Sequence, residues 1–195
     1  MHRELEGWVR DVANLTKPDR VVWCNGSEEE HQQLVRQQIA DGTLHHLNEK
    51  SFPHCYLHRS DPRDVARVEH LTFICTEKPE HAGPTNNWMS PAEAERRVRP
   101  LFEGAMRGRT MYVVPYIMGP KTSHLSRVGV EITDSPYVVI SMRTMTRMGK
   151  DALDRLGSDG AYVKGMHSLR DLSPDRRYIL HFPQRREIWS VGSGY

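Results

Sequence analysis

The fold of this chain is decided by residues 108–149, GRTMYVVPYIMGPKTSHLSRVGVEITDSPYVVISMRTMTRMG, the most apolar stretch of an otherwise polar sequence. Residues 111–118 are β-branched and aromatic and are followed by Gly119-Pro120, a pattern that predicts a buried strand and a turn. Residues 128–133 predict a second strand. We therefore place two strands at the hydrophobic centre of the domain.

The segment after the second strand has the signals of a helix. Asp134-Ser135-Pro136 puts a capping side chain before a proline at the first helical position. Gly149 sits where such a helix would stop in the left-handed conformation. The β-branched residues 138–140 favour a strand, but the three-residue spacing from Val139 to Met148 fits a helical face. We therefore predict a helix that ends at Gly149, with a strand as the alternative.

The composition indicates one globular domain. The chain has 195 residues, 37% hydrophobic content and a formal net charge of +2. This length suffices for one hydrophobic core. The net charge is too small to indicate a nucleic-acid partner by itself.

Neither a membrane nor a secretory route is indicated. The apolar runs are far shorter than the roughly 20 residues that span a bilayer, and the N-terminus lacks the apolar core of a signal peptide. Three widely spaced cysteines, Cys24, Cys55 and Cys75, fit reduced thiols better than a disulfide framework. We expect a cytoplasmic protein.

Helical and extended segments alternate along the chain. Leu5, Trp8, Val9 and Val12 have the spacing of an amphipathic helix. Helix-capping patterns start at Ser27, for a helix that stops near Gly42, and at Ser90-Pro91, for a helix through Phe102. The other predicted elements are strands at 20–24, 56–57, 72–75, 162–166, 178–182 and 187–191, a loop at 77–88 and a short helix at 152–156. This order predicts a single α/β domain, residues 1–195, with a mixed β-sheet flanked by helices.

Generic catalytic motifs are absent from the sequence: it has no GxxxxGK[ST] loop, GxGxxG, HExxH or GxSxG. His54, Cys55 and His58 could ligate zinc, but no second cluster completes four ligands, so we favour ordinary surface or core residues. The arginine pairs 96–97, 176–177 and 185–186, and Arg99, are typical of a solvated face. Arg67 differs, because it lies in an irregular connection where a guanidinium can bind a carboxylate or phosphate.

Five blocks of the sequence resemble the N-terminal domain of GTP-dependent phosphoenolpyruvate carboxykinase, in particular the bacterial members. They are DPRDVARVE (61–69), GPTNNWMSPAE (83–93), GRTMYVVPYIMGP (108–120), VGVEITDSPYVVISMRTMTRMG (128–149) and REIWSVGSGY (186–195). They occur in the family's order across nearly the whole chain.

The resemblance implies an activity and three site residues. The family converts oxaloacetate and GTP to phosphoenolpyruvate, GDP and CO2, with Mn²⁺ or Mg²⁺. Arg67 matches the arginine that engages the substrate carboxylate and the migrating phosphoryl group, a task that suits its fixed charge. Glu69 matches an acidic residue that contacts the closed lid, and Tyr195 matches the tyrosine that packs at the edge of the substrate.

The chain also departs from the family pattern. The family's metal ligands, phosphate loop, guanine pocket and lid follow the GSGY motif, beyond Tyr195. The segment from His167-Ser168 to Tyr178 is shorter than is usual in the family. Phosphoryl transfer depends on metal and phosphate-binding groups. We therefore expect no tight binding of GTP or metal and no activity from this chain alone.

Two classes of function stay open. The first is a fragment or half of a split carboxykinase that binds oxaloacetate or phosphoenolpyruvate weakly and pairs with a complementing nucleotide-binding half. The second is a non-catalytic anion-binding or interaction module, either a pseudoenzyme or a truncated remnant. Removal of the nucleotide domain would expose an apolar face, through which we expect self-association.

Overall fold

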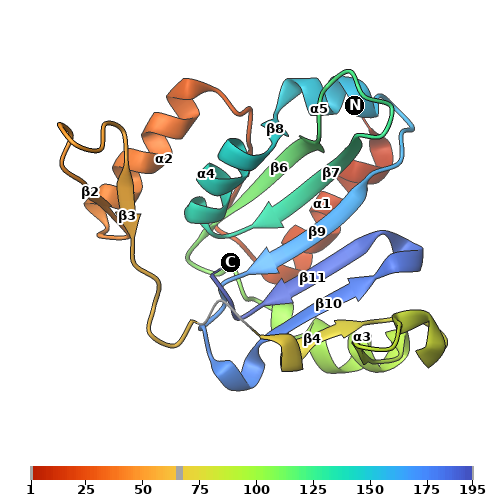
Figure 1. Ribbon diagram of the computed structural model, residues 1–195. Helices are drawn as coiled ribbons and strands as arrows, with labels where there is room; N and C mark the ends of the chain where they lie inside the picture. Colours follow the sequence, from red (N-terminus) through yellow and green to blue (C-terminus); the bar gives the residue numbers. More distant parts are fainter. Residues whose placement is uncertain (1, 65–67, 195) are drawn as a thin grey trace.

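The computed structural model describes residues 2–64 and 68–194, which form a mixed β-sheet with helices on both faces (Figure 1). The α-helices are α1 (Arg3–Thr16), α2 (Glu28–Ala40), α3 (Pro91–Val98), α4 (Pro136–Met145) and α5 (Lys150–Leu156). The 3-10 helices are η1 (Glu69–Leu71), η2 (Pro79–Ala82), η3 (Arg99–Phe102), η4 (Pro174–Arg176) and η5 (Pro183–Arg185). The predicted fold class, a single α/β domain, is confirmed.

Within the described residues, nine strands form the main sheet, in the order β1-β6-β7-β9-β11-β10-β4-β5, with β8 also paired to β6. They are β1 (Arg20–Trp23), β4 (Thr72–Ile74), β5 (Asn87–Trp88), β6 (Thr110–Met118), β7 (Arg127–Thr133), β8 (Arg147–Met148), β9 (Val163–Ser168), β10 (Tyr178–Phe182) and β11 (Glu187–Val191). A separate hairpin is made of β2 (Leu44–His46) and β3 (Tyr56–His58), and it projects away from the sheet (Figure 1).

The central pair is the one predicted from the apolar stretch. β6 and β7 pair antiparallel from Tyr112 opposite Thr133 to Met118 opposite Arg127. Side chains alternate between the two faces of a strand, so Val113 and Ile132 enter one core and Val114 enters another. All three are fully buried or nearly so.

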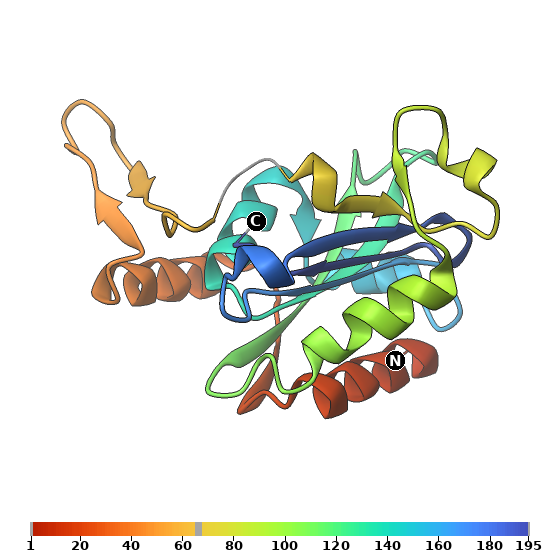
Figure 2. The ribbon, with the colours of Figure 1, turned by 90° about the horizontal axis from the view of Figure 1, so that it is seen from below.

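The helices cover the two faces unequally. α1, α3 and α5 bury Leu5, Val98 and Leu156 in the larger core, and Figure 2 shows α1 and α3 on the same side of the sheet. α2 and α4 pack on the opposite face, over β1 and β6. Farther along that opposite face, Ile74, Ile179 and Ile188 are half-buried.

The three predicted helix starts are confirmed by their capping hydrogen bonds. The hydroxyl of Ser27 accepts the N–H of Glu30, that of Ser90 accepts the N–H of Glu93, and that of Ser135 accepts the N–H of Val138. Each bond satisfies an otherwise unpaired donor of the first turn.

The predicted end of α4 at Gly149 is wrong. The helix ends at Met145, because Arg147 and Met148 leave it to pair with β6. Gly149 then precedes α5 with φ 85° and ψ −136°, which is not the left-handed helical conformation. A Cβ at Gly149 would lie 1.9 Å from the carbonyl oxygen of Asn25, so close packing explains this glycine.

Two other boundaries differ from the predictions. The expected loop at 77–88 contains η2 and ends in β5, whose Trp88 ring N–H donates to the carbonyl of Thr76 at 2.9 Å. The helix predicted through Phe102 is α-helical to Val98 and continues as η3, which contains Pro100.

Among the described residues, none of the helices has the length and apolarity to cross a membrane.

Candidate functional site

One edge of the main sheet gathers polar side chains from distant parts of the sequence. β7, β9 and β11 run parallel, so their carboxyl ends meet there. β6 runs antiparallel to β7, and β10 runs antiparallel to β11, so the amino ends of β6 and β10 lie at the same edge. We call this the polar edge, and we define it by Asp64, Arg109, Asp134, His167, Arg177 and the segment Gly192–Gly194.

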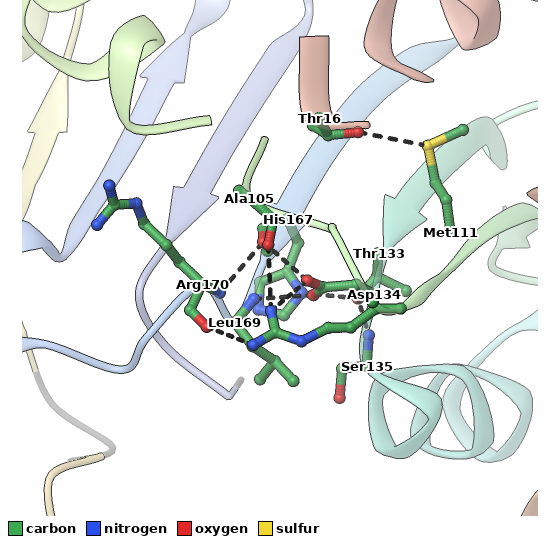
Figure 3. Close-up of polar contacts among 12 residues, drawn as sticks. Thr16, Ala105, Met111, Thr133, Asp134, Ser135, His167, Leu169 and Arg170 are labelled. Carbon is green, nitrogen blue, oxygen red and sulfur yellow. Dashed lines mark hydrogen bonds and ion pairs between the residues drawn. The ribbon is translucent and has the colours of Figure 1, made fainter. Parts of the chain in front are cut away.

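Asp134, directly after β7, is the centre of one network (Figure 3). Its Oδ2 accepts hydrogen bonds from Arg109 Nη1 at 2.8 Å and from the hydroxyl of Ser168 at 2.9 Å. Its Oδ1 accepts the N–H of Leu169 at 2.8 Å. The carboxylate is fully buried, and these donors compensate for its lost hydration.

His167, on β9, joins this network to the C-terminal segment. Its Nδ1 lies 2.7 Å from the hydroxyl of Thr133, and its Nε2 lies 2.7 Å from the carbonyl oxygen of Ser193. Because a carbonyl only accepts, Nε2 carries the proton and Nδ1 accepts from Thr133. Burial lowers the pKa of His167, although the nearby carboxylates of Asp134 and Asp64 oppose this shift. Burial thus favours the neutral imidazole.

Asp64 and Arg177 form a buried ion pair at the same edge, with Arg177 Nη2 3.6 Å from Asp64 Oδ1. Arg177 also donates from Nε to the carbonyl of Gly192 at 2.9 Å and from Nη2 to that of Arg63 at 2.7 Å. Asp64 Oδ2 accepts the N–H of Gly194 at 2.7 Å, and its Oδ1 accepts the hydroxyl of Ser193 at 3.2 Å. The pair thus ties the 61–64 segment to residues 192–194.

Both glycines of the C-terminal segment are needed for this packing. At Gly192, with φ 78°, a Cβ would lie 2.8 Å from the carbonyl oxygen of Arg176. At Gly194 a Cβ would lie 2.4 Å from Asp64 Oδ2. Either contact is too short for a carbon atom, so larger residues would displace the segment from the ion pair.

A half-buried carboxyl group lies on β7. Glu131 sits on the same face as Thr133, and its Oε2 occupies the space that a Cβ of Gly165 would need, at 1.8 Å. Burial raises the pKa of Glu131 to about 8. Glu131 is therefore largely protonated at neutral pH, in contrast to a surface glutamate.

A cleft of ≈ 450 Å³ opens beside the polar edge. Its walls include Asp64, Arg109, Asp134 and Gly194, together with His58 and Tyr137. The last two rings stack at 3.6 Å between centroids with 13° between their planes, which holds the β2–β3 hairpin against α4. The cleft combines apolar surface with several charged side chains, a lining that suits a small ligand with polar groups.

Of the three residues that the family resemblance selected, Arg67 and Tyr195 lie outside the described residues. Glu69 begins η1 and is exposed. Its backbone carbonyl accepts a hydrogen bond from Asn87 Nδ2 at 2.6 Å. The described neighbours Asp64 and Gly194, on the amino-terminal side of Arg67 and Tyr195 respectively, are in direct contact.

The prediction that Arg176-Arg177 forms a solvated face is wrong for Arg177, whose side chain is 2% exposed. Arg177 directly precedes β10 and is turned inward to Asp64, whereas Arg176 is exposed and pairs with Asp171. Asp64, Asp134 and His167 were not predicted to be members of one network. A signal was present for Asp64 and Asp134, since both lie in motifs that carried the resemblance, whereas His167 lies outside those five blocks.

The described residues offer no metal site: no group of three His, Cys, Asp or Glu side chains lies close enough to hold an ion. Asp134 already accepts three hydrogen bonds, and Asp64 faces Arg177. Both acids are therefore poor candidates as ligands of Mn²⁺ or Mg²⁺, which prefer free carboxylates and water.

The fold and the polar edge define an α/β domain with a cleft outside the carboxyl ends of its parallel strands, the usual ligand position in open α/β sheets. Residues 7–195 match the family model of the phosphoenolpyruvate carboxykinase N-terminal domain. The chain belongs to this family.

Full-length relatives support the same assignment. The chain is 58% identical, over 98% of its length, to "Phosphoenolpyruvate carboxykinase [GTP]" of Anaeromyxobacter dehalogenans strain 2CP-C. It is 51% identical over its full length to the protein of the same name from Corynebacterium jeikeium strain K411. These alignments cover 32% and 34% of the relatives, so the chain spans about a third of their length.

Proposed function

We propose that this chain supplies the oxaloacetate and phosphoenolpyruvate side of a GTP-dependent carboxykinase reaction. In this reaction oxaloacetate and GTP give phosphoenolpyruvate, GDP and CO2. We assign Arg67 to the substrate carboxylate and the migrating phosphoryl group, Tyr195 to the edge of the substrate, and Glu69 to contact with a lid. The observation that carries the proposal is the family match over residues 7–195.

The polar edge supports this assignment through its described residues. Asp64 binds Ser193 and Gly194 although about 130 residues separate them in sequence. The segment that leads toward Arg67 therefore meets the segment that leads toward Tyr195. A substrate anion beside them would lie next to the ≈ 450 Å³ cleft.

The chemistry of the reaction requires more than this chain is proposed to supply. Decarboxylation develops enolate charge next to a phosphoryl donor, and a fixed guanidinium stabilises that charge. Phosphoryl transfer also needs a metal and phosphate-binding groups. We assign those groups, with GTP and Mn²⁺ or Mg²⁺, to the part of the full-length relatives that this chain does not span.

Calorimetric titration tests the substrate site. Wild type and Arg67→Ala are titrated with oxaloacetate and with phosphoenolpyruvate, with and without Mn²⁺. We expect weak binding by wild type and a loss of about tenfold or more in Arg67→Ala, because a charge-assisted bidentate contact is removed. Arg63→Ala, which changes an exposed arginine of the same segment, is the matched control. Equal behaviour of wild type and Arg67→Ala would refute the site.

An activity assay tests whether this chain needs a separate nucleotide-binding half for catalysis. We expect no steady-state formation of phosphoenolpyruvate from oxaloacetate and GTP by the purified chain. Turnover that Arg67→Ala abolishes would show that the chain suffices for catalysis. Turnover restored by adding a nucleotide-binding half would support the split-enzyme proposal.

A second candidate function is a non-catalytic module that pairs with a complementing half or with itself. Three half-buried isoleucines surround His181 on one sheet face and favour it: Ile74 and Ile188 lie opposite His181 on the two neighbouring strands, and Ile179 lies two residues before it on β10. Sedimentation of wild type and Ile188→Thr over a range of concentrations tests self-association. We expect an association that weakens in Ile188→Thr, and a monomer at every concentration would exclude self-association.

A further inference from the structure

The buried Arg177 has a role that its neighbours in sequence do not share. Its guanidinium contacts carbonyl groups from three segments: Arg63, Leu172 and Gly192. It also faces the carboxylate of Asp64. A single side chain therefore joins the 61–64 segment, the connection between β9 and β10, and the C-terminal segment.

Burying a guanidinium is costly unless its charge is paired and its donors are bonded. Here the structure meets both conditions, with the side chains of Arg177 and Asp64 only 2% and 3% exposed. The planar guanidinium presents donors on several sides at fixed angles, so it holds these carbonyls in one relative position. A lysine has one nitrogen and cannot reach the same set of acceptors.

Asp64 fixes the C-terminal segment from the other side. It accepts the N–H of Gly194 and the hydroxyl of Ser193, and His167 holds the carbonyl of Ser193. Because a Cβ at Gly194 would lie 2.4 Å from Asp64 Oδ2, the segment approaches the carboxylate as closely as a backbone can. Buried groups thus hold residues 61–64 and 192–194 in contact at the polar edge.

We propose that Arg177 and Asp64 are positioning residues, which hold residues 61–64 and 192–194 in the geometry that anion binding at the polar edge requires. This inference rests on the proposed substrate site. Neither residue contacts substrate in the proposal. They act by fixing the backbone of the segments that lead to it.

Three variants distinguish a positioning role in ligand binding from a contribution to stability alone. Arg177→Met removes the guanidinium, and Arg177→Lys keeps a charge near Asp64 but loses the fork of donors. Arg176→Met is the matched control, since Arg176 is the adjacent, exposed arginine. Affinity for phosphoenolpyruvate is measured by calorimetry at low temperature, where circular dichroism verifies that each variant is folded. If Arg177→Met does not fold, Arg177→Lys carries the test.

We expect both Arg177 variants to bind phosphoenolpyruvate roughly ten- to a hundredfold more weakly than Arg176→Met, since small misplacements of a site have costs of this size. A merely structural role would lower the unfolding temperature and leave the affinity of the folded protein unchanged. Equal affinity in Arg177→Lys and Arg176→Met would overturn the proposal.

Amide hydrogen exchange tests the positioning role of Arg177 independently of phosphoenolpyruvate binding. If wild type does not bind phosphoenolpyruvate, the substrate proposal fails, but the exchange rate of the Gly194 amide still reports on the positioning. We expect that rate to rise about tenfold or more in Arg177→Lys relative to Arg176→Met, because the acceptor on Asp64 is no longer fixed. Equal rates would refute the positioning role.

Discussion

The polar edge and the β2–β3 hairpin use polar residues in opposite ways. At the polar edge, Asp64, Asp134, His167 and Arg177 are buried, and each makes hydrogen bonds or an ion pair. In the hairpin, the polar residues His45 and His46 are exposed, and so is the apolar Phe52, with 55% of its surface accessible. The comparison shows that geometry, more than residue type, separates a candidate site from an ordinary surface.

The largest effect is expected from breaking the buried ion pair. Asp64→Asn leaves the guanidinium of Arg177 buried without its carboxylate and should lower the free energy of unfolding by about 3–5 kcal/mol. Urea denaturation measures this value. The matched control is Asp61→Asn, which breaks the more exposed pair with Arg63 and should cost much less, because solvent screens an exposed pair. Similar costs for the two variants would contradict a special role for the edge.

A smaller effect on the free energy of unfolding is expected from the protonation of His167 at low pH. Burial lowers the pKa of His167 below its unfolded value, so the unfolded state binds the extra proton first as the pH falls. The stability contribution is present above the unfolded pKa of about 6.5 and is lost as the pH falls toward the folded pKa. A pKa difference of one between the folded and unfolded states corresponds to about 1.4 kcal/mol of stability.

Comparison of wild type with His167→Gln isolates this contribution. Glu131 acts in the opposite direction, because its pKa is raised to about 8 and its contribution is lost as the pH rises toward that value. The difference between wild type and His167→Gln in unfolding free energy should therefore shrink from pH 7.5 to pH 5. His45→Gln, which changes an exposed histidine of the hairpin, is the matched control. A constant difference for His167→Gln would contradict the account.

Loss of the contact between the β2–β3 hairpin and α4 should lower the free energy of unfolding only modestly. Tyr137→Leu removes the ring that stacks on His58 and should cost about 0.5–1.5 kcal/mol. The exchange of hairpin amides should also become faster, because this stack ties the hairpin to α4. Unchanged exchange at residues 44–58 would show that the stack does not hold the hairpin.

The smallest effects are expected within the hairpin itself. Phe52→Ser and Leu57→Thr replace side chains that are 55% and 43% exposed. Exposed substitutions of this kind usually change stability by no more than about 0.5 kcal/mol. Urea denaturation with a loss above 2 kcal/mol would show that the hairpin packs against another surface in solution.

The sequence predicted the elements that depend on local signals. Caps at Ser27 and Ser90 were found because each serine is followed three positions later by a glutamate, and the cap at Ser135 was found because a proline follows it. The strands β6 and β7 were found because burial on both faces gives continuous apolar runs. Gly149 was misinterpreted, since the contact with Asn25 that requires glycine is remote in sequence.

The candidate site could be predicted only in part. Motifs selected the segments around Arg67 and Tyr195, but the contact of Asp64 with Gly194 joins residues far apart in sequence. Nothing local distinguishes the buried Arg177 from the exposed Arg176, because the distinction depends on where β10 begins and which face each residue takes. The network at Asp134 likewise requires the pairing of β7 with β9.

Amide hydrogen exchange of the wild-type chain, with and without phosphoenolpyruvate, tests the central claim most directly. The account predicts strong protection at Leu169 and Gly194, whose N–H groups donate to buried carboxylates, and rapid exchange in the exposed hairpin turn at 48–54. Added phosphoenolpyruvate should increase protection at the polar edge. Exchange at Gly194 as fast as in the hairpin, or ligand protection confined to the hairpin, would contradict the account.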